Sequence, residues 1–223
     1  MVLFLLVIAI AVLAYAQDIT VKGKPVYIWL LREEGAVEKL TAILLFLSAL
    51  FALIAAFRVP ETLRWARPFL VLLSAFSALM ALEEISWGQR IFDIEPSAFF
   101  QQHSDQKEIN LHNVVQRYLK QSGFAVTKTR QIAAIVLLVY GVVLPVLSAF
   151  APMRSWLRKC RVVVPPPALM PGFFAGALLA WFDWPTGREE ELGELLFSLG
   201  FVLLVPLWRL QQRYAADAAS SPA

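Results

Sequence analysis

Apolar residues occur along this chain in long blocks, which short polar stretches separate. The alternation of apolar and polar residues that marks barrel strands is not visible. Backbone groups in hydrocarbon must find their hydrogen bonds within the segment, so long apolar blocks form helices. The pattern predicts an all-α fold, a polytopic transmembrane helix bundle that forms a single domain over residues 1–210. About six spans are expected, at residues 1–16, 37–57, 68–87, 131–151, 168–184 and 192–210.

The first apolar block has two interpretations. Its last residues, Ala14-Tyr15-Ala16, resemble a signal-peptidase site, but no Lys or Arg precedes the apolar run. A secretory signal begins with a positively charged region. We therefore expect a retained first helix, with a cleaved signal peptide as the alternative.

Two polar regions are long enough to have a structure of their own. The outer loop, 88–130, contains a segment at 107–121 that places Leu111, Val114, Val115 and Tyr118 on one helical face. We predict an amphipathic helix there, which lies in the membrane interface or caps the bundle. The last segment, 211–223, is rich in Ala and Ser, and we expect a disordered cytoplasmic tail.

Composition and charge agree with a membrane protein. Hydrophobic residues make up 59% of the 223 residues, the mean hydropathy is +0.63 and the net charge is +3. The bases cluster beside apolar blocks, as the positive-inside rule requires, so nucleic acid is not an expected partner. The expected partner is the lipid bilayer. The loops after the second and fourth blocks, the end of the sixth block and the tail carry nine Lys or Arg against two acids, which predicts that both termini are cytoplasmic.

The most informative polar residues are two adjacent carboxylates near the end of the third block. Glu83 and Glu84 lie about one turn inside Trp87, and a charge at that depth needs a partner. Arg90 is too far from Glu83 on a straight helix, unless the chain bends at Gly88. Both histidines, His103 and His112, follow in the outer loop.

These residues define the candidate chemistry. Glu83, Glu84, His103 and His112 are the candidate catalytic residues, because carboxylates and imidazoles move protons and bind metals. The candidate binding residues are Arg90, Asn110, Asn113 and Asp183. Glu108 and His112 are spaced by one residue too many for a Glu-x-x-His ligand pair, so the pattern specifies no metal and no cofactor. Gly172 and Gly176 form a G-x-x-x-G pattern that favours close helix packing.

Two runs of residues resemble a known family. E-E-I-S-W-G-Q-R-I at 83–91 and E-I-N-L-H-N at 108–113 look like the signature of an uncharacterised family of bacterial multi-pass membrane proteins. The run R-E-E-G at 32–35 is similar to that family's start, although Asp-Gly is more usual there. The resemblance covers roughly residues 30–120. It implies a bacterial inner-membrane protein and brings no activity with it.

Three functions are compatible with this sequence. In the first, the acids and histidines form a polar plug, and the protein is a scaffold or accessory subunit of a membrane complex, with other membrane subunits or a second copy as partners. In the second, Glu83, Glu84, His103 and His112 form the site of an outer-leaflet enzyme, a hydrolase or transferase acting on a lipid-like substrate. The third is a transporter or proton path. We favour the first, and whether the chain is an enzyme stays open.

Overall fold

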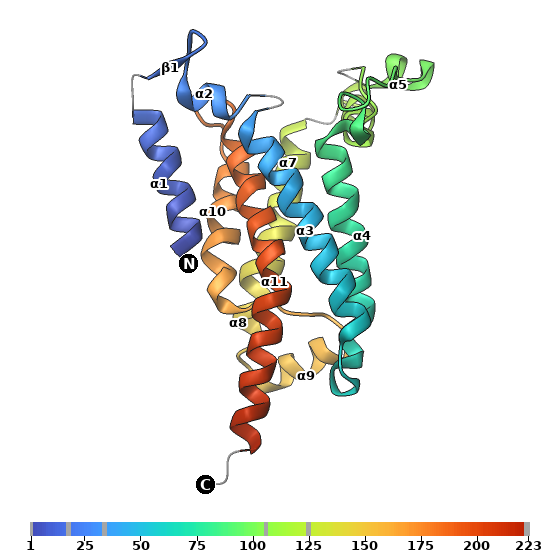
Figure 1. The fold of residues 1–223 in the computed structure, drawn as a ribbon, viewed down its shortest axis with the longest axis vertical. Coiled ribbons are helices and arrows are strands. Elements are labelled where there is room, and N and C mark those ends of the chain that lie inside the picture. The colour runs from blue at the N-terminus through green and yellow to red at the C-terminus, as the bar shows by residue number, and fades with distance from the viewer. Residues whose placement is uncertain (1, 17–18, 33–34, 105–106, 124–125, 221–223) are drawn as a thin grey trace.

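Four helices in the described part of the chain are long and apolar enough to cross a membrane. The computed structural model describes residues 2–16, 19–32, 35–104, 107–123 and 126–220. The long helices are α3 (Ala36–Arg58), η1 with α4 (Glu61–Ala66 and Arg67–Glu84), α7 with η3 and α8 (Val126–Leu138, Val139–Val143 and Leu144–Leu147), and α11 (Glu189–Ser220) (Figure 1). By length and hydropathy, this is a possible multi-pass membrane protein.

Two apolar helices are shorter than a bilayer span requires. They are α1 (Val2–Ala16) and α10 (Met170–Trp181), which follows the turn η4 (Pro167–Leu169). A helix of 15 residues rises about 22 Å, against about 30 Å of hydrocarbon. Four of the six expected spans therefore have the length to cross a bilayer, and the first and fifth fall short of it.

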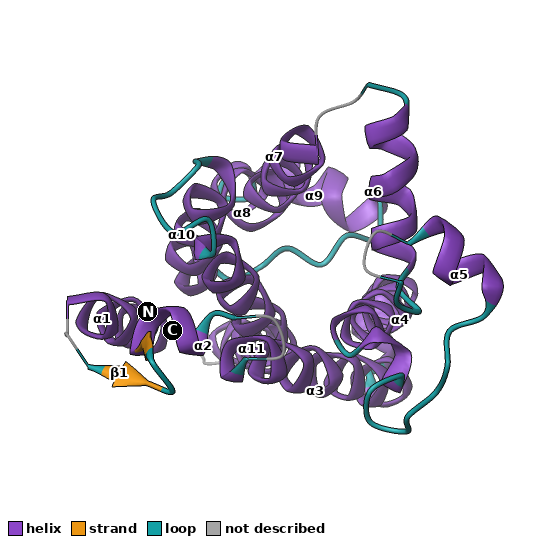
Figure 2. Cartoon of the chain, turned by 90° about the horizontal axis from the view of Figure 1, so that it is seen from above, coloured by secondary structure: helices purple, strands orange, loops and turns teal. Residues whose placement is uncertain are grey.

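The helices are arranged as a ring when viewed from above (Figure 2). α3 packs against α4 on one side and α11 on the other, and α10 packs against α11 and α7. Between α7 and α4, the ring is bridged by α6 (Leu111–Gln121) at one end and by α9 (Ala151–Lys159) at the other. α1 lies outside the ring beside α10.

Aromatic side chains fill the middle of the ring. Phe69 of α4 stacks on Tyr140 at 6.0 Å between ring centres, and Tyr140 stacks on Phe201 of α11 at 6.3 Å. Phe173 of α10 and Phe76 of α4 meet the same Phe201 edge-on, at 5.6 Å and 5.7 Å. Such ring pairs add to the free energy of burial, so this cluster holds opposite sides of the ring together.

The π-helical turn η3 lets α10 approach closely. Pro145 has no N–H for the carbonyl one turn earlier, and a π-turn absorbs that break in the hydrogen-bond ladder. Gly141 in this turn faces Phe173: a Cβ at Gly141 would lie 2.0 Å from the Phe173 ring. Because Gly141 has no side chain, the Phe173 ring can pack directly against the backbone of this turn.

The two glycines of the G-x-x-x-G pattern face different helices of the same chain. A Cβ at Gly172 would meet the ring of Phe4 in α1 at 2.1 Å, and one at Gly176 would meet Phe197 and the carbonyl of Gly193 in α11 at 2.8 Å and 3.0 Å. Small residues at helix contacts allow such approaches. In this structure the pattern serves packing within the chain.

An extended segment crosses the ring at its lower end. Residues 162–166 connect α9 to η4, and Val163 and Pro165 are fully buried. The hydroxyl of Tyr140 donates to the carbonyl of Val163 at 3.1 Å. A buried carbonyl outside regular structure needs a hydrogen-bond partner, and the Tyr140 hydroxyl supplies it for Val163.

The two ends of the bundle differ in charge. At one end α3 begins, α4 ends and α11 begins, and we call this the carboxylate end because Glu38, Glu83, Glu84, Glu191 and Glu194 lie there. At the opposite end α3 ends, α4 begins and α9 lies across the ring, and we call this the arginine end. Trp65, Trp156 and Trp208 belong to elements at the arginine end.

The remaining elements are short. A two-stranded hairpin, β1 (Thr20–Val21) with β2 (Lys24–Pro25), leads into α2 (Val26–Leu30). The turn η2 (Ser86–Gly88) and helix α5 (Ala98–His103) precede α6. The expected interfacial helix begins at Leu111 and not at 107, because Asn110 caps it. Of its expected apolar face only Val114 is buried.

The tail differs from the expectation. Helix α11 continues from the bundle to Ser220, over most of the segment 211–223 for which composition predicted disorder. Ala, Gln, Leu and Arg are strong helix formers, and an existing helix extends without a new nucleation step. Residues 221–223 lie outside the described part of the chain.

Candidate functional site

The third span ends in a left-handed turn that reverses the chain. Ser86, Trp87 and Gly88 have φ of 46°, 55° and 76°. Non-glycine residues rarely adopt such values, and they persist only where surrounding contacts hold them. At Gly88 a Cβ would also lie 2.9 Å from the ring of Phe92. The bend expected at Gly88 is therefore present, and it brings the following residues back over the end of α4.

Glu83 joins this turn to the start of α6. Its carboxylate accepts from the indole N–H of Trp87 at 2.7 Å and from the backbone N–H of His112 at 2.9 Å. The Asn110 side chain donates to the backbone carbonyl of Glu83 at 2.9 Å. Only 8% of Glu83 is exposed. A carboxylate at a helix N-terminus is stabilised by the unpaired N–H groups and the helix dipole, so α6 supplies the partner for this buried charge.

Asn110 is the N-cap of α6. Its side-chain oxygen accepts from the backbone N–H of Asn113 at 2.9 Å, while its amide nitrogen holds Glu83. Asn is among the preferred N-cap residues because its short side chain reaches the N–H groups of the first turn. One side chain thus starts α6 and attaches it to α4. In this geometry the Asn110 side chain makes structural contacts, and Asn113 takes part in them through its backbone N–H.

Glu108 is the second buried carboxylate of the turn. It accepts from the hydroxyl of Ser86 at 2.6 Å and pairs with Arg90. Sequence reasoning considered Glu108 only for its spacing from His112 and left the partner of Arg90 open. The actual pair forms because the left-handed turn redirects Arg90. Next to it, the backbone N–H of Ile109 donates to the side chain of Gln89 at 2.7 Å.

The two runs of the family-like signature therefore bind each other. Glu83, Ser86, Gln89 and Arg90 from the first run contact residues 108–112 of the second through hydrogen bonds and an ion pair. We call residues 86–121 the loop cap. Glu83 attaches this cap to α4, and Glu108 joins the two ends of the cap through Ser86 and Arg90. Both carboxylates are buried, where hydrogen bonds are worth more than at the surface.

Glu84 points to a different neighbourhood from Glu83. Its carboxylate interacts electrostatically with Glu191 of α11 and Glu38 of α3, and Glu194 interacts with Glu84 and Glu38. Glu84, Glu191 and Glu194 form no hydrogen bond or ion pair with another side chain in the ranges that the structure describes. Four carboxyl groups from three helices thus lie near one another at the carboxylate end, three of them half-buried and Glu194 exposed.

A buried hydroxyl lies at the level of Glu84. The hydroxyls of Ser48 in α3 and Ser77 in α4 are 3.1 Å apart, which sets the register of these antiparallel helices. Two turns further toward the carboxylate end, Thr41 comes level with Glu84. Thr41 is 2% exposed, and its hydroxyl has no hydrogen-bond partner within the described residues.

Asp183 belongs to a separate group of ion pairs around Arg130, which we call the Arg130 clamp. Arg130, at the start of the fourth span, donates to Asp183 at 2.6 Å and to Glu190 at 2.6 Å. It links α7 to the end of α10 and the start of α11. Sequence reasoning missed Arg130. It stands just before the fourth apolar block, and the acids Asp183 and Glu190 stand at block ends expected on the same side of the membrane, so an ion pair could have been predicted.

The two histidines take separate partners. His103 Nδ1 lies 2.9 Å from the carbonyl of Phe99, and its ring stacks between Phe99 and Tyr118. The imidazole of His112 pairs with Gln116. No group of three His, Cys, Asp or Glu side chains in the described residues has an arrangement that could hold a metal ion. The four candidate residues do not meet around one point: His112 lies near Glu83, whereas His103 stacks on aromatic rings and Glu84 lies near Glu191 and Glu38.

Comparison with protein-family models, with curated proteins and with solved structures gives no match for this chain.

Proposed function

We propose that this protein is a non-catalytic subunit, or scaffold, of a bacterial inner-membrane complex, and that it belongs to the family whose signature it resembles. One observation carries the proposal: the polar groups of the signature hold the loop cap together and, through Glu83, bind it to the bundle. A catalytic site keeps reactive groups accessible to a substrate, whereas here Glu83 and Glu108 are buried and hydrogen-bonded. Buried polar networks of this kind specify one arrangement of a surface.

The outer surface of the loop cap supports a role in binding. Large apolar side chains are exposed along it, and they are Ile91, Phe92, Phe99, Leu111, Val115 and Tyr118. Exposed apolar surface of this extent marks contact with a membrane or with another protein. A rigidly attached apolar cap is what a subunit interface requires. Under the positive-inside rule, we assign the arginine end to the cytoplasm and the loop cap to the outer face.

Purification from native membranes tests the proposal. The wild-type protein should copurify in a stoichiometric complex with other membrane proteins, or as a homo-oligomer, and so should the Glu95→Gln variant, which neutralises an exposed acid of the same loop. The Glu83→Gln/Glu108→Gln variant should insert at a normal level and lose the complex. Isolation of the wild type as a monomer free of partners would contradict the proposal.

A second candidate is a proton path. The proximity of Glu38, Glu84, Glu191 and Glu194 at the carboxylate end favours it, together with the Thr41 hydroxyl at the same level, which has no hydrogen-bond partner among the described residues. Acidic groups within membrane proteins commonly mark such paths. Proteoliposomes containing a pH-sensitive dye would show proton flux that Glu84→Gln abolishes and Glu61→Gln, at the arginine end, leaves intact. Absence of flux in the wild type would reject this candidate.

A further inference from the structure

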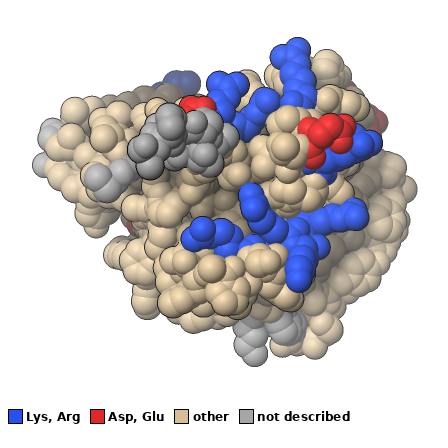
Figure 3. Space-filling view, turned by 90° about the horizontal axis from the view of Figure 1, so that it is seen from below, with Lys and Arg blue, Asp and Glu red and all other residues tan. Residues whose placement is uncertain are grey.

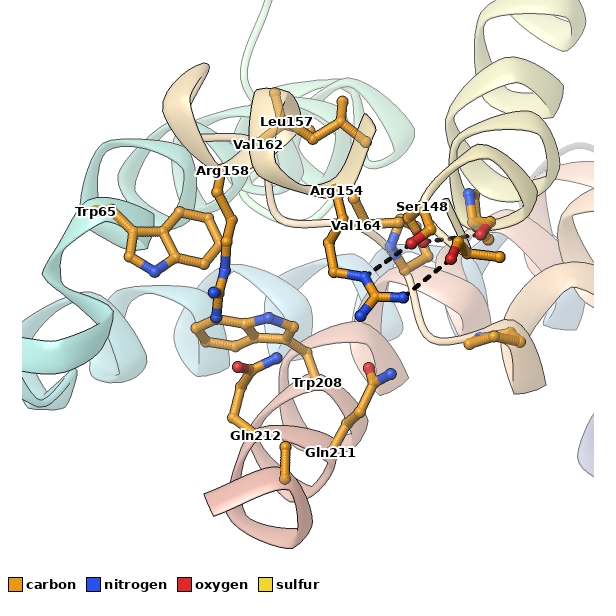
Figure 4. Close-up of a pocket in the computed structure, with 15 residues that line it drawn as sticks. Trp65, Ser148, Arg154, Leu157, Arg158, Val162, Val164, Trp208, Gln211 and Gln212 are labelled. Atoms are coloured by element: carbon orange, nitrogen blue, oxygen red, sulfur yellow. Dashed lines mark hydrogen bonds between the residues drawn. The ribbon is translucent and has the colours of Figure 1, made fainter. Parts of the chain in front are cut away.

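The arginine end contains a pocket that the proposed function does not use. It encloses about 490 Å³ between α9, the end of α8, the extended segment and the last third of α11. Figure 4 shows Arg154 and Arg158 reaching into it from α9, with Trp65 and Trp208 at its side and Gln211 toward its mouth. Figure 3 shows Lys and Arg gathered over the face on which it opens.

The residues that line this pocket include two arginines and no acid. Arg154 donates to the carbonyls of Ser148 and Ala149 at 2.8 Å and 3.2 Å, and the Arg158 guanidinium lies over the Trp65 ring at 5.6 Å from its centre. Neither forms an ion pair with an acid in the described part of the chain. On the same face, Glu61 is paired with Arg64. The pocket therefore presents two guanidinium groups in fixed positions to an anion.

The lining fits a phosphate ester. Arg guanidinium groups bind phosphate oxygens through several parallel N–H donors, and carboxamides such as those of Gln211 and Gln212 add neutral hydrogen bonds. The carbonyls that Arg154 binds hold this side chain in place, so little side-chain entropy is lost when an anion binds. The Trp65 ring does the same for Arg158.

The surroundings indicate that the phosphate belongs to a lipid. Large apolar side chains are exposed on α8, α9 and the turn between them, namely Val146, Phe150 and Trp156. Ser148 and Ala149, on the same turn, line the pocket itself. A headgroup in the pocket would leave its acyl chains beside these residues. Basic pockets between transmembrane helices on the cytoplasmic side bind anionic headgroups.

We infer that the pocket formed by Arg154, Arg158, Trp65, Trp208 and Gln211 binds the phosphate headgroup of an anionic phospholipid. This inference rests on the membrane orientation in the proposed function and not on the presence of partner subunits. Failure of the complex-forming experiment would therefore leave it untouched.

Binding of phosphatidylglycerol to the purified full-length protein tests the inference. In neutral detergent, phosphatidylglycerol should bind and raise the unfolding temperature, whereas phosphatidylcholine and inorganic phosphate should do neither. Each charge is worth about fivefold in affinity near an anionic headgroup, so Arg154→Gln/Arg158→Gln should weaken binding by about 25-fold. Arg64→Gln removes one charge from the same face outside the pocket and should change affinity by less than about twofold.

A second variant tests the inference independently, in case the double variant does not fold. Gln211 is exposed, so Gln211→Glu places a negative charge in the pocket without removing an internal contact. It should weaken phosphatidylglycerol binding about fivefold or more, while Ser155→Glu on α9 should not. Equal binding of phosphatidylcholine, or unchanged phosphatidylglycerol affinity in both pocket variants, would overturn the inference. An equal effect of inorganic phosphate would reassign the pocket to a soluble phosphate.

Discussion

The backbone N–H of His112 donates a hydrogen bond to Oε2 of Glu83 at 2.9 Å, so the first turn of α6 is attached to the last turn of α4. These two residues are far apart in the sequence. The contact makes Glu83 both an acid in the last turn of α4 and the anion at the N-terminus of another helix. It explains why a carboxylate is kept at this depth.

The first prediction concerns that carboxylate. Glu83→Gln keeps the shape of the side chain and removes the charge that Trp87 and the N-terminus of α6 bind. We expect a loss of about 1.5–3 kcal/mol in the free energy of unfolding, the usual value of a hydrogen bond to a charged group. Unfolding in mixed micelles measures it. Glu95→Gln, in the exposed part of the loop, is the control and should change stability by less than about 0.5 kcal/mol.

The second prediction concerns the left-handed turn. Gly88→Ala places a Cβ 2.9 Å from the Phe92 ring at a φ of 76°, whereas Gly123→Ala places one in open space at a φ of 79°. Both variants carry the backbone strain of about 1–2 kcal/mol, and only Gly88→Ala adds a steric clash. Hydrogen exchange of the loop cap should increase in Gly88→Ala alone. Equal effects of the two variants would show that the Phe92 contact adds nothing.

The third prediction concerns the Arg130 clamp. The Asp183 side chain is 83% exposed and that of Glu190 37%, although both oxygens lie 2.6 Å from Arg130. Water screens the more exposed pair, so double-mutant cycles should give about 1 kcal/mol for Arg130 with Glu190 and less than about 0.5 kcal/mol for Arg130 with Asp183. The variants are Arg130→Gln, Glu190→Gln and Asp183→Asn. A larger coupling to Asp183 would contradict the structure.

The fourth prediction concerns pH. Tyr27 of α2 is buried beside Glu189, and burial, reinforced by that carboxylate, raises the pKa of Tyr27 from 10.0 to about 12. The folded state holds the phenol proton more tightly than the unfolded state. The resulting stabilisation is therefore complete below pH 10 and is lost as the pH rises from 10 to 12. It amounts to roughly 2–3 kcal/mol.

Two tyrosine variants check the pH dependence. Unfolding free energies between pH 9 and pH 12 should fall steeply for the wild type and for Tyr214→Phe, whose ring is exposed on α11. Tyr27→Phe should remove the Tyr27 part of that slope. A phenolate absorbance that develops fully near pH 10 for all tyrosines would show that Tyr27 is not shielded.

The sequence predicted the helices and singled out the end of the third block, because both are visible in short stretches of neighbouring residues. Apolar blocks report directly on whether a segment is helical in a membrane, and Glu83 with Glu84 stood out because charges are costly at that depth. Asn110 sits before an amphipathic pattern, where an N-cap is expected. The first apolar block, expected at 1–16, agrees with α1, whereas α10 ends at Trp181, before the expected end at residue 184, because the chain turns toward Pro185 there.

The sequence by itself determined the helical class of this protein, its apolar blocks and the presence of acids near the end of the third block. Only the tertiary structure decided which contacts Glu83 and Glu84 each make. Glu83 binds the start of α6 and Glu84 faces Glu191 and Glu38, because adjacent residues on a helix point about 100° apart and meet different neighbours. It also paired Arg90 with Glu108 and placed Arg154 and Arg158 in one pocket. Such contacts depend on the direction of turns and on the packing of distant segments, and a pattern along one chain does not contain them.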